Sequence, residues 1–327
     1  MMTTDEFLAE WRNGSDTMLV HTSGSTGRPK PMLVEKRRME ASARITCGFL
    51  NLHEGDTALL CLPLDYIAGK MMMVRALTCG LRLTSVEPDS HPLSDAHFPA
   101  AVPGFSLAAM IPMQVWNTLQ VPAERERLRQ IRHLLIGGGA IDDTLAAELR
   151  DFPNAVWSTY GMTETLSHVA LRRLNGPDAS LWYTPFEGVP LALSPEGCLM
   201  IDAPAVHDGR LTTNDMAELA DDGRFRILGR RDNMVCSGGI KIQVEEVERL
   251  LRPHLHLPFM ITKRKDERLG EAVVLLLAGT ADADSLTAIC RTVLPRYWQP
   301  RQYVFVDQLP MTETGKPARG EAERLAR

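Results

Sequence analysis

The chain has 327 residues, of which 44% are hydrophobic and 24% charged, enough for two packed domains or one large one. Its formal net charge of -5 argues against a nucleic-acid-binding protein that works through a broad basic surface. Residues 1–14 are polar and acidic, without the apolar core of a signal peptide, and no apolar run is long enough to span a bilayer. We therefore expect a cytoplasmic protein that neither inserts into membranes nor binds nucleic acid.

The first half alternates short apolar runs with helical patterns. Strand-like runs cover residues 18–20, 57–62, 81–86, 131–136 and 156–160, and helical spacing covers 36–49, 69–77 and 144–149, the last after the capping residue Asp142. This alternation predicts an α/β domain with a largely parallel sheet. The loops at 21–30, 137–140 and 160–164 each follow a predicted strand, so they can converge on one cleft.

The pattern changes near residue 195. Short strands are predicted at 197–201, 216–219 and 225–228, which indicates a small β section. After Gly229 come a polar segment, a helix with several glutamates in its first turns, and strands at 272–277 and 303–306. We interpret residues from about 230 onward as a smaller α+β domain, joined by a short boundary that suits a hinge.

The six cysteines indicate no metal or disulfide framework. None belongs to a C-x-x-C pair, and no histidine cluster completes a zinc pattern. Reduced and mostly buried thiols are the expectation for Cys47, Cys61, Cys79, Cys198, Cys236 and Cys290.

The strongest local signal is the run TSGSTGRPK at residues 22–30. Small residues leave backbone N–H groups open, hydroxyls add donors, and Lys30 balances a polyanion, which is what a triphosphate-binding loop needs. The run is not a Walker A sequence, because Arg28 and Pro29 separate Gly27 from Lys30. A plain Ser/Gly surface loop is the alternative.

Four weaker signals follow it along the chain. They are Tyr160–Glu164, Thr213–Asp215, Gly229–Asp232 with Gly238 and Gly239, and Leu309–Lys316 with the pattern LPxTxxGK. Each alone is a commonplace turn. In this order, the five together resemble the adenylate-forming superfamily of acyl-CoA synthetases, non-ribosomal adenylation domains and luciferases.

The resemblance implies a fold and a set of ligands. It implies an α/β fold with a large N-terminal domain, here residues 1–231, and a small mobile α+β C-terminal domain, residues 232–327. The large domain is shortened at its front, since only 21 residues precede the first motif. It further implies ATP, Mg²⁺ and CoA as ligands, a carboxylic acid as substrate, and leaves a homo-oligomer possible.

Carried over to this chain, the resemblance assigns a role to each motif residue. The residues that would hold the β- and γ-phosphates are Thr22, Ser23, Gly24, Ser25, Thr26, Gly27 and Lys30. The adenine side would be lined by Gly137, Gly138, Gly139 and Ala140, with Tyr160 stacked on the base. Thr163 would contact the α-phosphate and Glu164 the Mg²⁺, while Asp215 and Arg230 would bind the ribose. Asn214 stands where glycine is common in the superfamily.

The same carry-over implies a switch between two half-reactions. Lys316 would reach the attacking carboxylate and the α-phosphate, and with Mg²⁺ would offset the repulsion between two anions. A rotation at the hinge residue Asp232 would then withdraw Lys316 and bring Gly238 and Gly239 beside a channel for the CoA thiol.

Within the superfamily, the chain is most similar to the o-succinylbenzoate–CoA ligases of menaquinone synthesis. The likeness rests on residues 62–70, LPLDYIAGK, on Met73–Arg75, and on residues 160–172, YGMTETLSHVALR. That acid has a second carboxylate that is not activated, and Arg75 is the candidate cation for it, although a surface helix position explains Arg75 equally well. Tyr66 and Leu166 could flank the ring, and Ser167 and His168 could face the acid without a proton-transfer role for His168.

Other readings of the sequence remain open. The chain could be another aryl- or acyl-CoA ligase with the same machinery, an adenylation domain that loads a carrier protein, or a catalytically silent nucleotide-binding protein.

Overall fold

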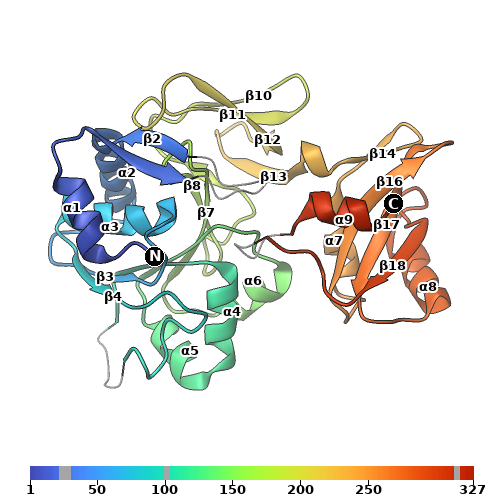
Figure 1. Cartoon of the computed structure of the whole chain (residues 1–327), viewed down its shortest axis with the longest axis horizontal. Helices are drawn as coiled ribbons and strands as arrows, with labels where there is room; N and C mark the ends of the chain where they lie inside the picture. The colour runs from blue at the N-terminus through green and yellow to red at the C-terminus, as the bar shows by residue number, and fades with distance from the viewer. Residues whose placement is uncertain (22–30, 99–103, 313–316) are drawn as a thin grey trace.

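The computed structural model describes residues 1–21, 31–98, 104–312 and 317–327. Figure 1 shows two lobes joined by a narrow connection, with the elements from α1 to β13 in a large lobe and those from β14 to α9 in a small lobe. The large lobe therefore holds Tyr160–Glu164 and Thr213–Asp215, the segment Gly229–Asp232 runs from it into the connection, and the small lobe holds Gly238 and Gly239.

A seven-stranded sheet forms the centre of the large lobe. Its order is β4 (Arg82–Ser85), β3 (Thr57–Leu60), β5 (Leu107–Met110), β6 (His133–Ile136), β7 (Ala155–Gly161), β8 (His168–Arg173) and β9 (Thr184–Pro185). Strands β4 to β7 pair in parallel, and β8 and β9 are antiparallel, so the expectation of a largely parallel sheet is confirmed. Because β6 and β7 are parallel neighbours, the segments that follow them lie at the same edge of the sheet.

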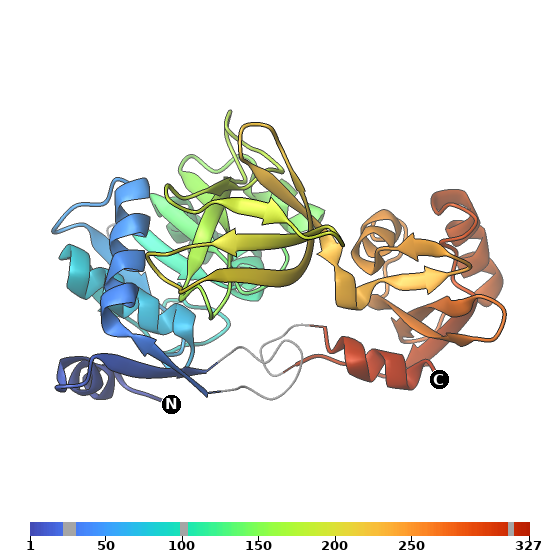
Figure 2. The same cartoon turned by 90° about the horizontal axis from the view of Figure 1, so that it is seen from above.

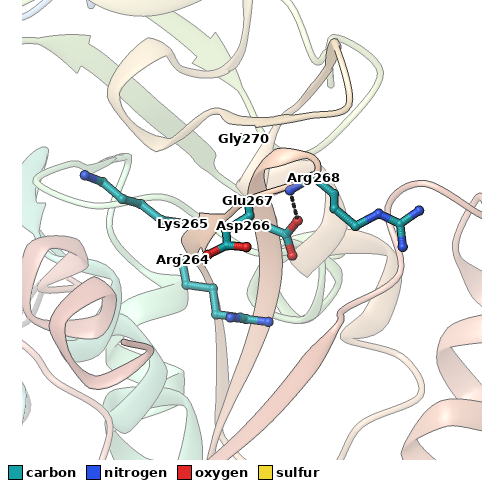
Figure 3. A pocket seen from close by; sticks show the side chains of 6 residues that line it. All are labelled: Arg264, Lys265, Asp266, Glu267, Arg268 and Gly270. Carbon is teal, nitrogen blue, oxygen red and sulfur yellow. Dashed lines mark hydrogen bonds between the residues drawn. The ribbon is translucent and has the colours of Figure 1, made fainter.

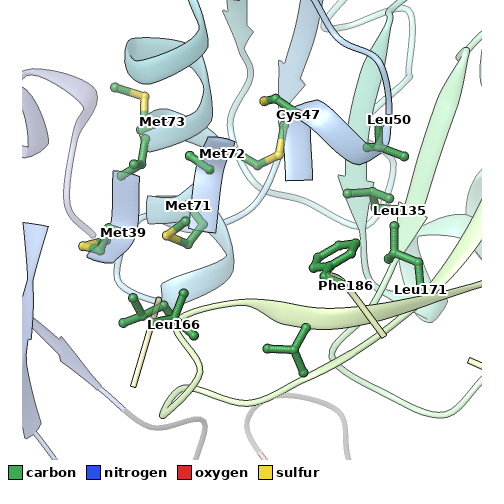
Figure 4. Close-up of a cluster of buried hydrophobic side chains, with 14 of the residues drawn as sticks. Met39, Cys47, Leu50, Met71, Met72, Met73, Leu135, Leu166, Leu171 and Phe186 are labelled. Carbon is green, nitrogen blue, oxygen red and sulfur yellow. The ribbon is translucent and has the colours of Figure 1, made fainter. Parts of the chain in front are cut away.

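Helices cover both faces of this sheet. They are α1 (Thr4–Arg12), α2 (Lys36–Phe49), α3 (Ile67–Cys79), α4 (Pro112–Gln120), α5 (Pro122–Arg129) and α6 (Asp143–Leu149). Successive side chains of β3 alternate between two cores: Ala58 and Leu60 join the core under α2 and α3, while Leu59 joins the core under α4 to α6. Figure 4 shows the first core, which is rich in methionines such as Met39, Met71 and Met72.

The strand before the Ser/Thr/Gly run lies outside the central sheet. Strand β1 (Thr17–His21) pairs with β2 (Pro31–Glu35) in a separate antiparallel two-stranded sheet. The loop at 22–30 was expected to follow a strand, and β1 does precede it, but β1 is not a member of the parallel sheet. Its inward residues Met18 and Val20 explain the placement, because both are buried in the α2–α3 core.

A four-stranded antiparallel sheet forms the β section. It consists of β10 (Leu191–Leu193), β11 (Cys198–Asp202), β12 (Arg210–Leu219) and β13 (Phe225–Arg230). Strand β12 begins six residues before Met216, where the sequence pattern put it, so Thr213–Asp215 lies within a strand and not in a turn.

The small lobe has its own sheet and cores. After the 3₁₀ turn η1 (Arg231–Asn233), it contains β14 (Val235–Ser237), β15 (Ile240–Ile242), α7 (Val244–Leu251), β16 (Phe259–Asp266), β17 (Gly270–Ala278), α8 (Ala283–Val293), β18 (Gln302–Val306) and α9 (Arg319–Leu325). Strands β15, β14, β17 and β16 follow one another in antiparallel pairs, and β18 pairs in parallel with β17. Figure 2 shows the helices of this lobe around its sheet, apart from the large lobe.

The cysteines and the helices bear on two expectations from composition. All six cysteines are free; four are buried, Cys79 is partly buried and Cys236 is exposed, so the expectation of mostly buried thiols is confirmed. Within the residues that the structure describes, no helix has the length and apolar character needed to cross a membrane.

Candidate functional site

Three motif residues from distant segments meet at one end of β7. The hydroxyl of Tyr160 donates to Oδ2 of Asp215 over 2.7 Å, and Nη1 of Arg230 donates to Oδ1 of Asp215 over 3.3 Å. Asp215 and Arg230 are direct partners in the β12–β13 register, which explains their contact. We call these three residues the Tyr160 corner. The Asp215 carboxylate has about four acceptor positions, so two remain for a ligand's hydroxyl groups.

The ring of Tyr160 is held by residues that the sequence did not single out. It packs edge-on against Phe225 at 5.1 Å and tilted against Tyr183 at 5.8 Å between ring centroids. Tyr183 is fixed in turn by a hydroxyl contact of 2.8 Å to Ser158. Burial, with the neighbouring Asp215 carboxylate, raises the pKa of Tyr160, so its hydroxyl stays a donor.

Arg230 links this corner to the lobe junction. Its Nη2 donates to Oδ2 of Asp232 over 2.7 Å. Burial disfavours its charged form, but the carboxylates of Asp232 and Asp215 outweigh that effect and raise the pKa of Arg230. The predicted hinge residue Asp232 and the predicted ribose-binding residue Asp215 therefore share the guanidinium of Arg230.

The glycine run after β6 lies close to β7. A Cβ atom on Gly137 would lie 2.3 Å from Oγ1 of Thr159, so a side chain here would force the Thr159 side chain to shift. Gly138 has φ +79° and Gly139 and Ala140 are exposed. Asp142 then caps α6, as predicted, by accepting from the backbone N–H of Leu145 over 2.8 Å.

A buried threonine shapes the turn between β7 and β8. The hydroxyl of Thr165, which the sequence reasoning missed, accepts from the Met162 N–H at 3.0 Å and lies 2.7 Å from the Ser167 carbonyl, to which it can donate. Leu166 has a left-handed φ of 63°. A Cβ atom on Gly161 would lie 2.2 Å from the Ser167 carbonyl oxygen and 2.5 Å from Cα of His168, so the turn can close only on glycine.

This turn carries the two candidates for phosphate and metal contacts. Thr163 is buried and Glu164 is partly exposed. Among the described residues, no group of three or more His, Cys, Asp or Glu side chains could hold a metal ion. A lone carboxylate fits Mg²⁺ only where phosphate oxygens and waters supply the other ligands, which is the usual situation for Mg²⁺ bound with a nucleotide.

Arg75 lies on α3 and is 2% exposed, so the alternative that it is a surface helix residue is wrong. Its Nη2 donates to Oγ of Ser167 over 2.6 Å, its Nη1 lies 3.7 Å from the sulfur of Met72, and its Nε is buried without a hydrogen-bond partner. Within the described part of the chain no carboxylate forms an ion pair with it. Burial lowers the pKa of Arg75 to about 10.

Ser167 and His168 continue from Arg75 in a chain of hydrogen bonds. Oγ of Ser167 lies 3.2 Å from Nδ1 of His168, and Nε2 of His168 lies 3.1 Å from Oγ1 of Thr46. Thr46 donates to the Ser42 carbonyl at 3.1 Å, so its oxygen is left to accept from His168. With the proton on Nε2, His168 donates to Thr46 and accepts from Ser167 at Nδ1, and every hydrogen bond then runs from Arg75 towards Ser42. Burial, with the charge of Arg75, lowers the pKa of His168, so the ring is neutral. We call Arg75, Ser167, His168 and Thr46 the Arg75 chain.

The two candidates for the ring of the acid are placed differently. Leu166 is 2% exposed and belongs to the same core as Met71 and Met72 (Figure 4). Tyr66 is partly exposed at the position before α3. No contact that the structure records joins the two side chains, so their shared role stays a prediction.

The glycine pair Gly238–Gly239 forms the tip of the β14–β15 hairpin. Both have positive φ, 58° and 81°, and both are exposed. The N–H of Gly238 donates to the Leu269 carbonyl over 2.8 Å, which joins this tip to the β16–β17 turn. A hollow of about 700 Å³ lies at that turn, lined by residues 264–268 and Gly270. Figure 3 shows the side chains of Arg264, Lys265 and Arg268 pointing in different directions.

The remaining candidates lie outside the described residues. They are Thr22, Ser23, Gly24, Ser25, Thr26, Gly27, Lys30 and Lys316. The residues on both sides of Lys316 are held together: Met311 and Pro317 form a β-bridge, and the Ala318 N–H donates to the Pro310 carbonyl over 2.9 Å. Arg319 then forms an ion pair with Glu248 of α7, with Nη2 at 2.8 Å from Oε2.

Comparisons with known proteins agree with this arrangement. A model of the AMP-binding enzyme family matches residues 7–193, and a model of the AMP-binding enzyme C-terminal domain matches residues 261–316. The 2-succinylbenzoate–CoA ligase of Geobacillus kaustophilus is 28% identical over 341 residues, which cover 94% of this chain and 69% of that protein. The corresponding ligase of Bacillus mycoides is 24% identical with the same coverage.

Two solved structures are similar over nearly the whole chain. An acyl-CoA synthetase (AMP-forming)/AMP-acid ligase II-like protein from Dyadobacter fermentans is 32% identical, with a TM-score of 0.65, over 97% of this chain and 91% of that one. The o-succinylbenzoate coenzyme A synthetase (MenE) of Bacillus subtilis, in complex with ATP and magnesium, is 24% identical, with a TM-score of 0.76, over 93% of this chain and 69% of that one. At this identity the second likeness shows the fold alone, the adenylate-forming fold. The AMP-binding enzyme model matches more than half of this chain, so the chain belongs to the AMP-binding enzyme family.

Proposed function

We propose that this protein is an AMP-forming acid–thiol ligase that activates a carboxylic acid with ATP and transfers the acyl group to CoA. In the first step a carboxylate oxygen attacks the α-phosphorus, the bond to the bridging oxygen breaks, and pyrophosphate leaves. In the second, the CoA thiolate attacks the acyl carbon and AMP leaves. The names of two relatives support this proposal, a 2-succinylbenzoate–CoA ligase and an acyl-CoA synthetase (AMP-forming)/AMP-acid ligase II-like protein.

The Tyr160 corner is the observation that carries this proposal. Three residues separated by as many as 70 positions, each from a different motif, meet around the Asp215 carboxylate. Asp215 keeps acceptors for ribose hydroxyls, and Tyr160 presents an aromatic ring that is fixed by packing and can stack on a base. The glycine run 137–140 follows the strand next to β7, and it supports an adenine site at the same edge of the sheet.

The charge balance of the first step supports roles for three further residues. A carboxylate that attacks a phosphate brings two anions together, so Thr163 and Lys316 would donate to the charge that develops. Mg²⁺, held by Glu164 and phosphate oxygens, would neutralise part of it. A division at residues 231 and 232, with Asp232 as the hinge, would let one small domain serve both half-reactions, presenting first Lys316 and then Gly238 and Gly239.

For the acid, o-succinylbenzoate is the proposed substrate, as in menaquinone synthesis. Arg75 supports it, since a buried guanidinium with unused donors and no carboxylate partner among the described residues favours a ligand with a second, unreactive carboxylate. Ser167 and His168 hold Arg75 from one side, and Leu166 and Tyr66 would flank the aromatic ring.

The test is acid-dependent release of AMP in the presence of CoA, with o-succinylbenzoate as the first acid. We expect AMP and the CoA thioester in equal amounts, and AMP release that depends on the acid. 4-Oxo-4-phenylbutanoate, which keeps the ring and the succinyl chain but lacks the ring carboxylate, is the matched comparison and should react at least about 100-fold less efficiently if Arg75 has the proposed role.

Other outcomes would replace parts of the proposal. Activity with other acids but not o-succinylbenzoate would indicate another acyl- or aryl-CoA ligase. Acid-dependent ATP–pyrophosphate exchange without thioester formation from CoA would indicate loading of a carrier protein. Absence of exchange with every acid would favour a catalytically silent nucleotide-binding protein.

A further inference from the structure

The segment that joins the lobes is held to β12 by one side-chain amide. Nδ2 of Asn214 donates to Oδ2 of Asp232 over 3.3 Å, and Nη2 of Arg231 donates to Oδ1 of Asn214 over 3.1 Å. Only this orientation of the amide satisfies both partners, because a carboxylate accepts and a guanidinium donates. Asp232 also accepts from Arg230 over 2.7 Å. The bonds of Asn214 therefore fix both residues at the start of η1 to the strand that carries Asp215.

On the other side of the same junction, the small lobe buries two polar atoms without partners. Oε1 of Gln243 and Oε2 of Glu245 have no hydrogen-bond partner. Both face Gly229, where an added Cβ atom would lie 2.7 Å from the first and 2.8 Å from the second. Unpaired buried acceptors destabilise the arrangement that buries them. The unpaired acceptors of Gln243 and Glu245 thus disfavour this orientation of the lobes, whereas the hydrogen bonds of Asn214 favour it.

A second contact between the lobes is too weak to decide the balance. Nη1 of Arg252, after α7, lies 3.4 Å from Oδ2 of Asp142, and the two side chains are 47% and 39% exposed. Exposed pairs of this kind contribute little. The bonds around Asp232 are the main polar support that the described residues give to this orientation.

We propose that Asn214 is a positioning residue that stabilises this lobe orientation and thereby sets the ratio of the two half-reactions. It acts through Asp232 and Arg231 and touches no substrate. A glycine at this position could form neither bond. The inference rests on the proposed function only for the half-reactions, since the orientation itself can be measured without any substrate.

The direct test measures the distance between the lobes. Spin labels at Arg150→Cys on the large lobe and Arg324→Cys on the small lobe, both exposed positions, would be placed in a Cys236→Ser background. The protein with Asn214 should show one dominant distance. We expect Asn214→Gly to increase the population of other distances about fivefold relative to that one. Arg231→Gln, which breaks the same link from its other end, should shift the distribution in the same direction.

Thr212→Gly is the matched control, because Thr212 is an exposed neighbour in β12 whose side chain forms no bond in the described structure. It introduces the same strand glycine and should leave the distances unchanged. Equal distributions in Asn214→Gly and Thr212→Gly, each compared with the unmutated chain, would overturn the proposal.

Enzyme rates give a second, independent readout. Asn214→Gly should change ATP–pyrophosphate exchange and thioester formation from preformed acyl-adenylate by different factors, whereas a merely structural role would lower both equally. Equal losses would therefore contradict the inference. If the unmutated protein activates no acid, the proposed function fails, and the distance measurement still tests Asn214.

Discussion

The Tyr160 corner and the Arg75 chain each contain an arginine, but the two arginines differ in the partners of their charge. Arg230 is shared by two carboxylates, and they raise its pKa. Arg75 is buried with a serine and a thioether as its only partners in the described structure, and burial lowers its pKa. An arginine whose charge is paired with carboxylates of the same chain needs no further anion. A buried arginine without a carboxylate partner is stabilised when an anionic ligand binds beside it. The comparison supports the two proposals made above, that the first region orients a neutral ribose and that the second binds a charged group.

Removal of the carboxylate at the centre of the Tyr160 corner should have the largest effect. Asp215→Ala leaves the Tyr160 hydroxyl and one side of Arg230 without a partner, and removes the proposed ribose acceptor. We expect kcat/KM for ATP to fall by about 100- to 1,000-fold, since loss of one partner of a buried charged hydrogen bond costs about 2–5 kcal/mol. Steady-state kinetics with ATP varied provides the measurement, and an unchanged KM for the acid is the control.

Replacement of the arginine in the other region should separate function from stability. Arg75→Met keeps a long side chain beside Met72 but removes the charge. We expect the KM for a dicarboxylic acid to rise about 100-fold, and the free energy of unfolding to increase by about 1–3 kcal/mol because an unpaired buried charge is lost. A variant that loses acid affinity and also loses stability would contradict the view that Arg75 is uncompensated.

Between pH 5 and 7.5 the pH dependence of stability should come from buried histidines, among them His168 of the Arg75 chain, and not from the Tyr160 corner. Folding lowers the pKa of His168 below its ordinary 6.5, so the unfolded chain binds a proton there that the native state does not. Stability from this residue is fully present above pH 6.5 and is lost as the pH falls, at about 1.4 kcal/mol per pH unit.

Thermal unfolding between pH 5 and 7.5 measures this slope. His168→Gln should reduce it, and so should His133→Gln, because burial lowers the pKa of His133 to about 4. His53→Gln, at an exposed position, is the matched substitution for comparison. Tyr160, whose pKa is raised, should contribute nothing over this range.

The smallest effect should follow from removing one hydroxyl. Tyr160→Phe keeps the ring and its packing on Phe225 but deletes the 2.7 Å bond to Asp215. We expect the KM for ATP to rise about fivefold, as for the loss of one hydrogen bond of about 1 kcal/mol. A change as large as that of Asp215→Ala would show that the hydroxyl, and not the carboxylate, controls the corner.

Local patterns predicted the elements of the large lobe well. Helix α2 occupies residues 36–49, as its spacing indicated, and Asp142 caps α6. The patterns missed short elements such as β5 and α4, which lack a long periodic run, and they placed the start of β12 too late. Tertiary pairing decided these cases, since Thr213–Asp215 extends a strand only because β11 and β13 flank it.

The site residues were predictable where motifs exist and hidden where contacts are distant. Arg75 and His168 could be proposed from the sequence, but Thr46 could not, because 122 positions separate it from His168. In the sequence, Tyr183 and Phe225 cannot be told from other aromatic residues, and only the folded chain shows that they pack against Tyr160. The partnerless Nε of Arg75 likewise follows from packing and not from any pattern.

The closeness of Gly161 to the next loop has a consequence for engineering this protein. Gly161 adjoins Tyr160 in the chain, yet the space for a Cβ atom there is occupied by the backbone of Ser167 and His168. Any side chain would push these two residues away from Arg75 while it shifted the tyrosine. The proposed acid-binding and nucleotide-binding regions therefore share one main-chain contact, and libraries that aim at new acids should leave this position unaltered.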